Sequence, residues 1–249
     1  MDKYQFLKEE ERLDYTLQTL NEEILNYIEK RKEIANYILD YRKNFIEEHK
    51  DDEDALMEYF DHERYVKEES YKQIDKKLME LTKLKETPYF GKVIFSDEDE
   101  CQEEIYVGRY GLTKDATFEN VIIDWRAPIA SLFYKGSLGP ATYKTPDGEL
   151  PADILARRQF VIKKGSLQGY FDSEVDVKDE ILQMILSSNS GEKLKDIVMT
   201  IQQEQDDIIR EERMKVVVVN GVAGSGKTTI ALHRVAYLLY NYRQQLGNK

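Results

Sequence analysis

The sequence predicts a chain of mixed α and β class: a long antiparallel helical hairpin, a small antiparallel β region and the start of a parallel α/β unit. Residues 1–86 contain neither proline nor glycine and are rich in Glu, Lys, Leu and Ile. Residues 89–171 alternate short apolar runs with turn-forming residues. Further on, a glycine-rich loop stands between a valine run and an apolar helix. We therefore expect domains at 1–86, 87–172 and 173–249.

The amino-acid composition argues against a nucleic-acid-binding surface, a disulfide framework and a membrane protein. The 249 residues carry a net charge of −12, so the chain as a whole does not predict a nucleic-acid surface, and a basic protein partner fits it better. Cys101 is the one cysteine, so no disulfide and no cysteine-based metal cluster is expected. No apolar leader or bilayer-length run is present, which predicts a cytoplasmic protein without a membrane partner.

An apolar seam in residues 13–45 repeats at alternating steps of four and three, as in a coiled coil. It comprises Leu13, Leu17, Leu20, Ile24, Tyr27, Arg31, Ile34, Ile38, Tyr41 and Phe45, where only Arg31 is charged. A second seam comprises Leu56, Phe60, Tyr71, Ile74, Leu78 and Leu81. The break in register near residue 50 favours an antiparallel hairpin, and one uninterrupted dimeric coil is the alternative.

The turn between these helices is acidic. It contains Asp51, Asp52, Glu53 and Asp54, and Asp51 or Asp52 would cap the second helix. Two interpretations stay open at this point: a solvated, charge-rich turn, or a row of carboxylates that faces a partner.

Thr87-Pro88 ends the helical region, because the residue before a proline is driven out of the α conformation. The candidate strands that follow are Tyr89–Phe95, Glu104–Tyr110, Asn120–Asp124, Ala130–Tyr134 and Arg158–Ile162. No helix of about 12 residues separates them, so we expect antiparallel pairing. Three short helices are then expected at 179–188, 192–200 and 202–211.

The strongest motif is Gly221-Val222-Ala223-Gly224-Ser225-Gly226-Lys227-Thr228, followed by Thr229. It fits the phosphate-binding pattern G-x-x-x-x-G-K-[ST]. The run 214–219 before it reads as a buried parallel strand, and residues 229–240 after it read as an apolar helix. Strand, loop and helix together are the context that this motif requires.

The chemistry of a triphosphate accounts for these residue types. Gly221, Gly224 and Gly226 let the backbone approach a polyphosphate, towards which N–H groups and the positive end of the helix would point. Lys227 would place its ammonium on the β and γ phosphates, and the Thr228 hydroxyl would ligate Mg²⁺. The sequence therefore predicts a nucleoside triphosphate site with Lys227 and Thr228 as its catalytic candidates.

A second stretch, residues 121–124, is similar to a metal-binding motif. The run VIID at 121–124 looks like the strand whose aspartate holds Mg²⁺ in nucleotide-binding folds. However, it precedes the glycine loop by about a hundred residues, whereas such a strand normally follows the loop. We therefore predict a structural turn with a buried Trp125 there. Because one strand and one helix do not make a domain, we also expect the chain to be the N-terminal portion of a longer ATPase.

Several segments together resemble a known family. TIQQEQDDIIR (200–210) followed by VNGVAGSGKTT (219–229) is similar to the first, RecA-like motor domain of superfamily 1 helicases of the UvrD/Rep class. DWRAP (124–128), RQF (158–160) and ALHRVAYLLY (231–240), with the N-terminal hairpin, resemble the HelD branch. These are helicase-like ATPases that associate with bacterial RNA polymerase, and some are called DNA helicase IV.

The resemblance implies roles for particular residues. Gln205 would read adenine through its amide, while Gln202 would cap the helix. The full-length protein would be an ATP hydrolase that uses ATP and Mg²⁺. We expect weak or no hydrolysis by the 249-residue chain alone, because later motifs of the class lie beyond it.

The leading functional hypothesis is a motor that remodels or recycles RNA polymerase, binding the core enzyme. The resemblance implies that the hairpin enters the polymerase secondary channel, where residues 51–54 would face basic walls or the catalytic Mg²⁺. DNA would be contacted through parts beyond residue 249. The alternative is a DNA helicase that translocates on single strands in replication or repair. A third reading is a structural coiled-coil protein whose nucleotide loop switches its shape.

Overall fold

The computed structural model describes residues 3–48, 62–97, 101–135, 137–146, 148–172, 201–214, 216–222 and 224–243. Two long helices come first, α1 (Lys3–Glu48) and α3 (His62–Leu84). The middle of the chain contains β1 (Gly91–Ser96), β2 (Gln102–Gly108), β3 (Leu112–Lys114), β4 (Glu119–Asp124), η1 (Pro128–Ala130), α4 (Ser131–Tyr134), β5 (Gly139–Thr145), β6 (Gly148–Lys163) and β7 (Ser166–Asp172). Two helices follow, α6 (Gln203–Arg210) and α7 (Lys227–Asn241). The fold is therefore mixed α and β.

The seven strands form one sheet. Its order is β3-β4-β2-β1-β6-β5, and β7 pairs with β6 outside this path. The pairs are antiparallel, as expected, except that β2 and β4 run parallel. The strand β6 is 16 residues long and pairs along its length with β5, β1 and β7 in turn. It is therefore the element that joins β5 and β7 to the rest of the sheet.

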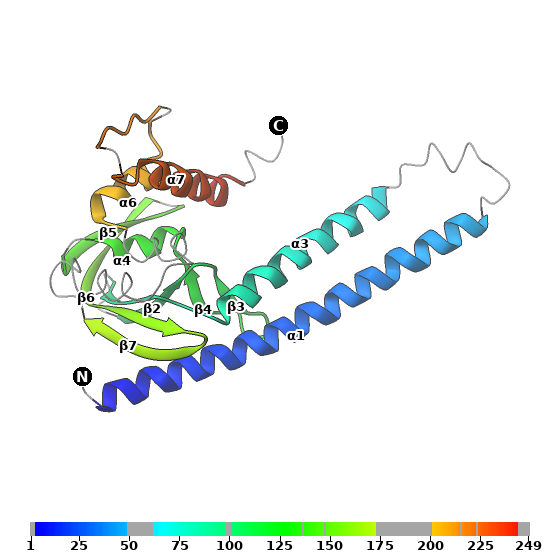
Figure 1. The fold of residues 1–249 in the computed structure, drawn as a ribbon, viewed down its shortest axis with the longest axis horizontal. Helices are drawn as coiled ribbons and strands as arrows, with labels where there is room; N and C mark the ends of the chain where they lie inside the picture. The colour runs from blue at the N-terminus through cyan, green and yellow to red at the C-terminus, as the bar shows by residue number, and fades with distance from the viewer. Residues whose placement is uncertain are drawn as a thin grey trace.

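The sheet lies between two helical layers, with the base of the α1–α3 hairpin on one side and α4, α6 and α7 on the other (Figure 1). The first core cluster includes Val93, Phe95, Trp125, Phe133, Ile209, Ile230 and Tyr237. The second includes Leu13, Leu20, Leu81, Leu84, Tyr89, Tyr106 and Phe160. Strand β1 shows the alternation that separates them: Val93 and Phe95 join the first cluster, while Lys92, the residue before Val93, pairs with α1.

Helices α1 and α3 lie side by side and antiparallel (Figure 1), as the two seams predict. The charged seam residue Arg31 has partners across the pair: its Nε donates to the Tyr71 hydroxyl at 3.0 Å, and its Nη2 lies 3.1 Å from Asp75. Farther out, Arg42 pairs with Glu68 at 2.9 Å. The predicted acidic tip, Asp51 to Asp54, lies outside the described residues.

A buried ion cluster fixes the first turns of α1 to the sheet. Glu9 is 2% exposed, and its Oε1 accepts hydrogen bonds from Lys92 at 3.3 Å and from Arg158 at 2.8 Å. Its Oε2 accepts the Tyr106 hydroxyl at 3.1 Å. One carboxylate on α1 therefore binds three neighbouring strands, β1, β2 and β6.

The strand prediction for Ala130–Tyr134 is wrong. These residues form the end of η1 and the whole of α4, and all of them are buried. Pro128 lies at the first helical position, where its fixed φ favours a helical turn. Because every residue of the run is buried, its apolar pattern had neither a strand nor a helix period.

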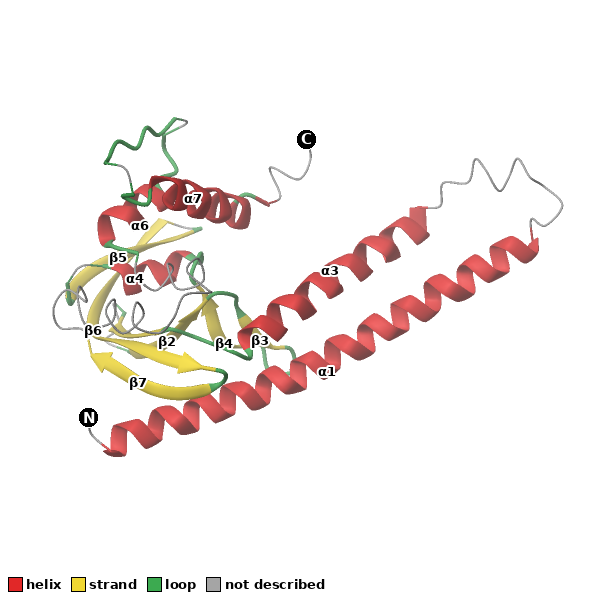
Figure 2. Ribbon diagram, viewed as in Figure 1, coloured by secondary structure: helices red, strands yellow, loops and turns green. Residues whose placement is uncertain are grey.

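The predicted buried strand before the glycine loop is also not observed. Residues 216–220 have no strand structure, and Figure 2 draws them as a loop. Val216 and Val218 are 78% and 87% exposed. A lone strand leaves its backbone N–H and C=O groups unpaired, and in the described part of the chain no neighbouring strand satisfies them. The start of a RecA-like sheet is therefore not observed.

Three strands were missed in the sequence, β3, β5 and β7. The turn between β6 and β7 is made by Lys164 and Gly165, both at positive φ (50° and 72°), which is the geometry of a tight hairpin. Of the three short helices expected after the sheet, the last is confirmed as α6. The expected helices at 179–188 and 192–200 lie outside the described residues.

Candidate functional site

Two of the three glycines expected to favour positive φ in the glycine loop, Gly224 and Gly226, adopt it. Gly224 and Gly226 have φ of +83° and +80°, a region that other residues rarely adopt. At Gly221 a Cβ would lie 2.8 Å from the Ser225 hydroxyl oxygen, so that hydroxyl would have to rotate away. Gly224 and Gly226 therefore shape the tight turn that leads into α7.

The start of α7 is uncapped by side chains. Its N-cap is Gly226, no side chain of the described residues caps it, and its first turn contains no acidic residue. The first N–H groups of a helix need an acceptor from outside the helix and carry partial positive charge. An anion is the ligand that such an end accepts most readily.

Lys227, the first residue of α7, bends back over the loop. Its Nζ donates to the carbonyl oxygens of Gly221 and Val222 at 2.9 and 2.7 Å and lies 3.5 Å from the Ser225 hydroxyl. Neutral carbonyls are weaker acceptors than phosphate oxygens, so this ammonium could exchange them for a phosphate. Thr228 next to it is exposed. The residues present therefore fit a triphosphate.

Gln205 is found in a different role from the one that we expected. Its Oε1 accepts the backbone N–H of Gln202 at 3.2 Å, which closes a capping box at the start of α6. Gln202 is the N-cap residue, which confirms its predicted role. Reading of adenine by Gln205 stays a prediction.

Asp124 is a structural residue, as predicted. It is 5% exposed, and Arg126 donates to it through Nε at 2.8 Å and Nη2 at 2.6 Å. Trp125 is also buried, at 4% exposed. In the described part of the chain, no group of three or more His, Cys, Asp or Glu side chains is placed to hold a metal ion.

One face of α7 rests on this DWRAP turn (residues 124–128). His233 packs edge-on against Trp125, with ring centroids 5.4 Å apart, and one turn later Tyr237 is buried. Another turn on, Asn241 donates to the Arg126 carbonyl at 3.4 Å. Burial, together with the positive charge of Arg109, lowers the pKa of His233, so its imidazole is neutral at pH 7. The helix that carries Lys227 is thus docked on the sheet.

Sequence reasoning missed the contact that holds α6 on the same turn. Arg210 donates through Nη1 to the Ala127 carbonyl at 3.1 Å and through Nη2 to the Trp125 carbonyl at 2.6 Å. Its Nε bonds to Asp206. The one available signal was that residues 124–128 and 200–210 both carry the family resemblance. Nothing in the sequence indicates that these two segments are in contact.

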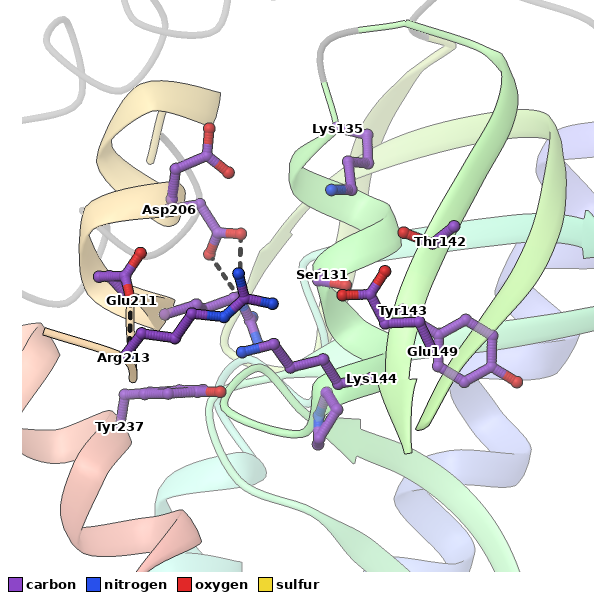
Figure 3. Close-up of a pocket in the computed structure, with 13 residues that line it drawn as sticks. Ser131, Lys135, Thr142, Tyr143, Lys144, Glu149, Asp206, Glu211, Arg213 and Tyr237 are labelled. Atoms are coloured by element: carbon purple, nitrogen blue, oxygen red, sulfur yellow. Dashed lines mark hydrogen bonds and ion pairs between the residues drawn. The ribbon is translucent and has the colours of Figure 1, made fainter. Parts of the chain in front are cut away.

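A cavity of about 330 Å³ lies beside this contact, between α6 and the sheet (Figure 3). Its charged lining residues are Asp206, Asp207, Glu211, Arg210, Arg213, Lys135, Lys144 and Glu149. Four are cationic and four are anionic, so the cavity offers a polyanionic triphosphate no net attraction. The glycine loop therefore remains the candidate phosphate site.

A comparison with protein-family models matches residues 6–184 to the family described as DNA helicase IV HelD, N-terminal domain. This is well over half of the chain. The chain belongs to the HelD family. A comparison with curated proteins found no match. The HelD match covers the hairpin and the whole sheet, and it ends before α6 and the glycine loop. Among the described helices of this HelD-family chain, none has the length and apolar character to cross a membrane.

Proposed function

We propose that this HelD-family chain binds ATP and Mg²⁺ at residues 221–229, as part of a helicase-like ATPase that acts on RNA polymerase. The observation that carries the nucleotide site is the pairing of an uncapped helix N-terminus with the Lys227 ammonium. The backbone N–H groups of Gly221, Val222, Ala223, Gly224, Ser225 and Gly226, with Thr229, would surround the phosphates, although Ala223 lies outside the described residues. Gln205 would select adenine.

Each remaining role follows from the chemistry of its group. Lys227 would exchange two neutral carbonyls for phosphate oxygens, which are stronger acceptors. The Thr228 hydroxyl would contribute one ligand to Mg²⁺, and phosphates and water would supply the others, as is usual for this ion. When bound, Mg²⁺ would neutralise charge on the phosphates.

Removing the ammonium should abolish most of the affinity. We expect Lys227→Ala to weaken ATP binding about ten- to a hundredfold, because a hydrogen bond to a charged group contributes roughly 1.5–3 kcal/mol. Isothermal titration calorimetry of the 249-residue chain with ATP and Mg²⁺ measures this. Lys83→Ala, an exposed lysine on α3, is the matched control and should bind like the wild type. Absence of ATP binding by the wild-type chain would refute the proposal.

The hairpin supports the polymerase part of the proposal. Lys30 of α1 pairs with Asp115, next to β3, at 2.7 Å, and farther out both helices extend away from the sheet (Figure 1). A rigid antiparallel pair of this shape could enter a channel, and basic channel walls would attract residues 51–54.

Shortening the hairpin should abolish polymerase binding without affecting ATP binding. A full-length protein that lacks residues 35–70, with α1 joined to α3 by a short Gly-Ser linker, keeps the Arg31–Asp75 pair and the buried base. We expect it to lose co-migration with core RNA polymerase on size exclusion while it still binds ATP. Unchanged co-migration would contradict a role for the hairpin.

The family description, DNA helicase IV, favours a second candidate function, translocation on single-stranded DNA. The two functions differ in what stimulates ATP turnover by the full-length protein. A DNA helicase responds to single-stranded DNA without polymerase, whereas a polymerase-directed motor responds to the core enzyme. The hairpin deletion should spare the first response and remove the second.

A further inference from the structure

Helix α6 is too short to hold its own position. It has eight residues, and an isolated helix of this length is unstable in water. Its support comes from its neighbours: Ile209 is fully buried in the first core cluster, and Arg234 of α7 donates to the Ile208 carbonyl at 2.7 Å. Further support is polar and comes from the DWRAP turn.

That polar support is the Arg210 guanidinium, in which each of the three nitrogens donates a hydrogen bond. The Nε of Arg210 bonds to both carboxylate oxygens of Asp206, at 2.8 and 2.9 Å, while its two Nη groups donate to the Trp125 and Ala127 carbonyls. Both side chains are buried, 10% exposed for Arg210 and 6% for Asp206. Figure 3 shows Asp206 pointing from α6 towards the sheet, with its bonds drawn as dashed lines. Burial raises the pKa of Asp206, and Arg210 opposes this shift.

Gln205 is the neighbour of Asp206 on this helix. Its side chain is tied to the first turn by the capping box, so its direction depends on the orientation of α6 as a whole. The turn whose carbonyls bind Arg210 also holds α7, whose first residue is Lys227. The DWRAP turn thus supports both the helix of the predicted adenine reader and the helix of the phosphate loop.

We propose that Arg210 and Asp206 are positioning residues that set the base selectivity of the nucleotide site, by clamping α6 to the DWRAP turn so that Gln205 faces the base. The inference rests on the proposed function and extends it, because neither residue touches the phosphates. Loss of the clamp should release Gln205 and leave the loop at 221–228 able to bind phosphates.

The test compares three ligands on the 249-residue chain: ATP, GTP and inorganic tripolyphosphate, each with Mg²⁺, by calorimetry. The wild type should prefer ATP to GTP at least tenfold, and Gln205→Ala should remove this preference. Arg210→Lys keeps the charge but not the planar fork that bonds a carboxylate and two carbonyls at once. It should reduce the preference at least fivefold and change tripolyphosphate affinity less than twofold. Asp206→Asn should act in the same direction.

Arg158→Lys is the matched control for the loss of a buried arginine fork. Arg158 bonds Asp172 through Nε and Nη2 and Glu9 through Nη1, on the opposite side of the sheet. This variant should lower the melting temperature without changing the ratio of ATP to GTP affinity. If Arg210→Lys fails to fold, Asp206→Asn gives the same comparison with less disruption.

The outcomes separate the two proposals. A wild-type chain that binds no ATP, or binds ATP and GTP alike, overturns both the adenine role of Gln205 and the clamp. A preference that Gln205→Ala removes but Arg210→Lys and Asp206→Asn retain overturns the clamp alone. Equal losses for all three ligands in the Arg210 and Asp206 variants also overturn it, because they indicate a general loss of structure.

Discussion

Glu9→Ala should destabilise the chain by about 3 kcal/mol, measured by urea or thermal unfolding. Removing one partner of a buried ion pair costs roughly 3–5 kcal/mol, because a charge is left uncompensated. Here Lys92 and Arg158 lose the carboxylate that lies between them. We expect the lower end of the range, because Lys92 keeps Glu104 at 2.8 Å and Arg158 keeps Asp172 at 2.6 Å.

The neighbouring acid provides the control for this variant. The Glu104 side chain is 46% exposed, so Glu104→Ala should cost less than about 1 kcal/mol even though it also removes a salt bridge to Lys92. Hydrogen exchange should localise the effect of Glu9→Ala to α1, which loses the carboxylate that binds β1, β2 and β6. Equal destabilisation by the two variants would show that burial of Glu9 is not what matters.

Trp125→Ala should cost about 3–5 kcal/mol, the range for truncating a buried large aromatic side chain. Trp125 is 4% exposed, belongs to the first core cluster and packs against His233 of α7. Because the substitution opens a cavity beside α7, hydrogen exchange in that helix should accelerate. The pKa of His233 should rise towards its ordinary value, since burial is the main cause that lowers it.

Two measurements decide this prediction. Chemical denaturation gives the change in the free energy of unfolding, and proton NMR titration gives the pKa of His233. Trp125→Phe, which keeps an aromatic ring, should cost less and leave the pKa of His233 lower than in Trp125→Ala. A loss of stability below about 1 kcal/mol, with no change in that pKa, would contradict the docking of α7 on the DWRAP turn.

Local pattern accounts for much of the fold. The absence of proline and glycine and the heptad seams identify α1 and α3, because a helix in contact with one neighbour needs only a narrow apolar stripe. Strands β1, β2 and β4 are apolar on both faces or strongly alternating, and these were found. The missed strands β3 and β5 lie at the two ends of the sheet order, where burial imposes little pattern. Pro140 further disguises β5.

Errors arose where tertiary context decides the structure. The valine run 216–219 has strand propensity, but a strand needs hydrogen-bonding neighbours that local sequence cannot supply. For the candidate site, the glycine loop could be predicted because its turn and helix end are local. The hydrogen bonds from Arg210 to Trp125 and Ala127 could not be predicted, because these two residues lie 85 and 83 positions before Arg210 in the sequence.

The sixteen-residue strand β6 has a consequence for the order of assembly. Arg158, which anchors α1 through Glu9, stands 149 positions after that acid, and the same strand aligns β1, β5 and β7. As a polypeptide grows from the ribosome, α1 and α3 can associate early, since they are neighbours in sequence. The pairs that β6 makes with β1, β5 and β7 must wait for residues 148–172, whereas β1 to β4 can pair before them. Pairings between distant segments form slowly because they close long loops. The nascent chain therefore carries a formed hairpin before its base is bound to the sheet. Once β6 is synthesised, Arg158 can bind Glu9 and attach α1 to the sheet.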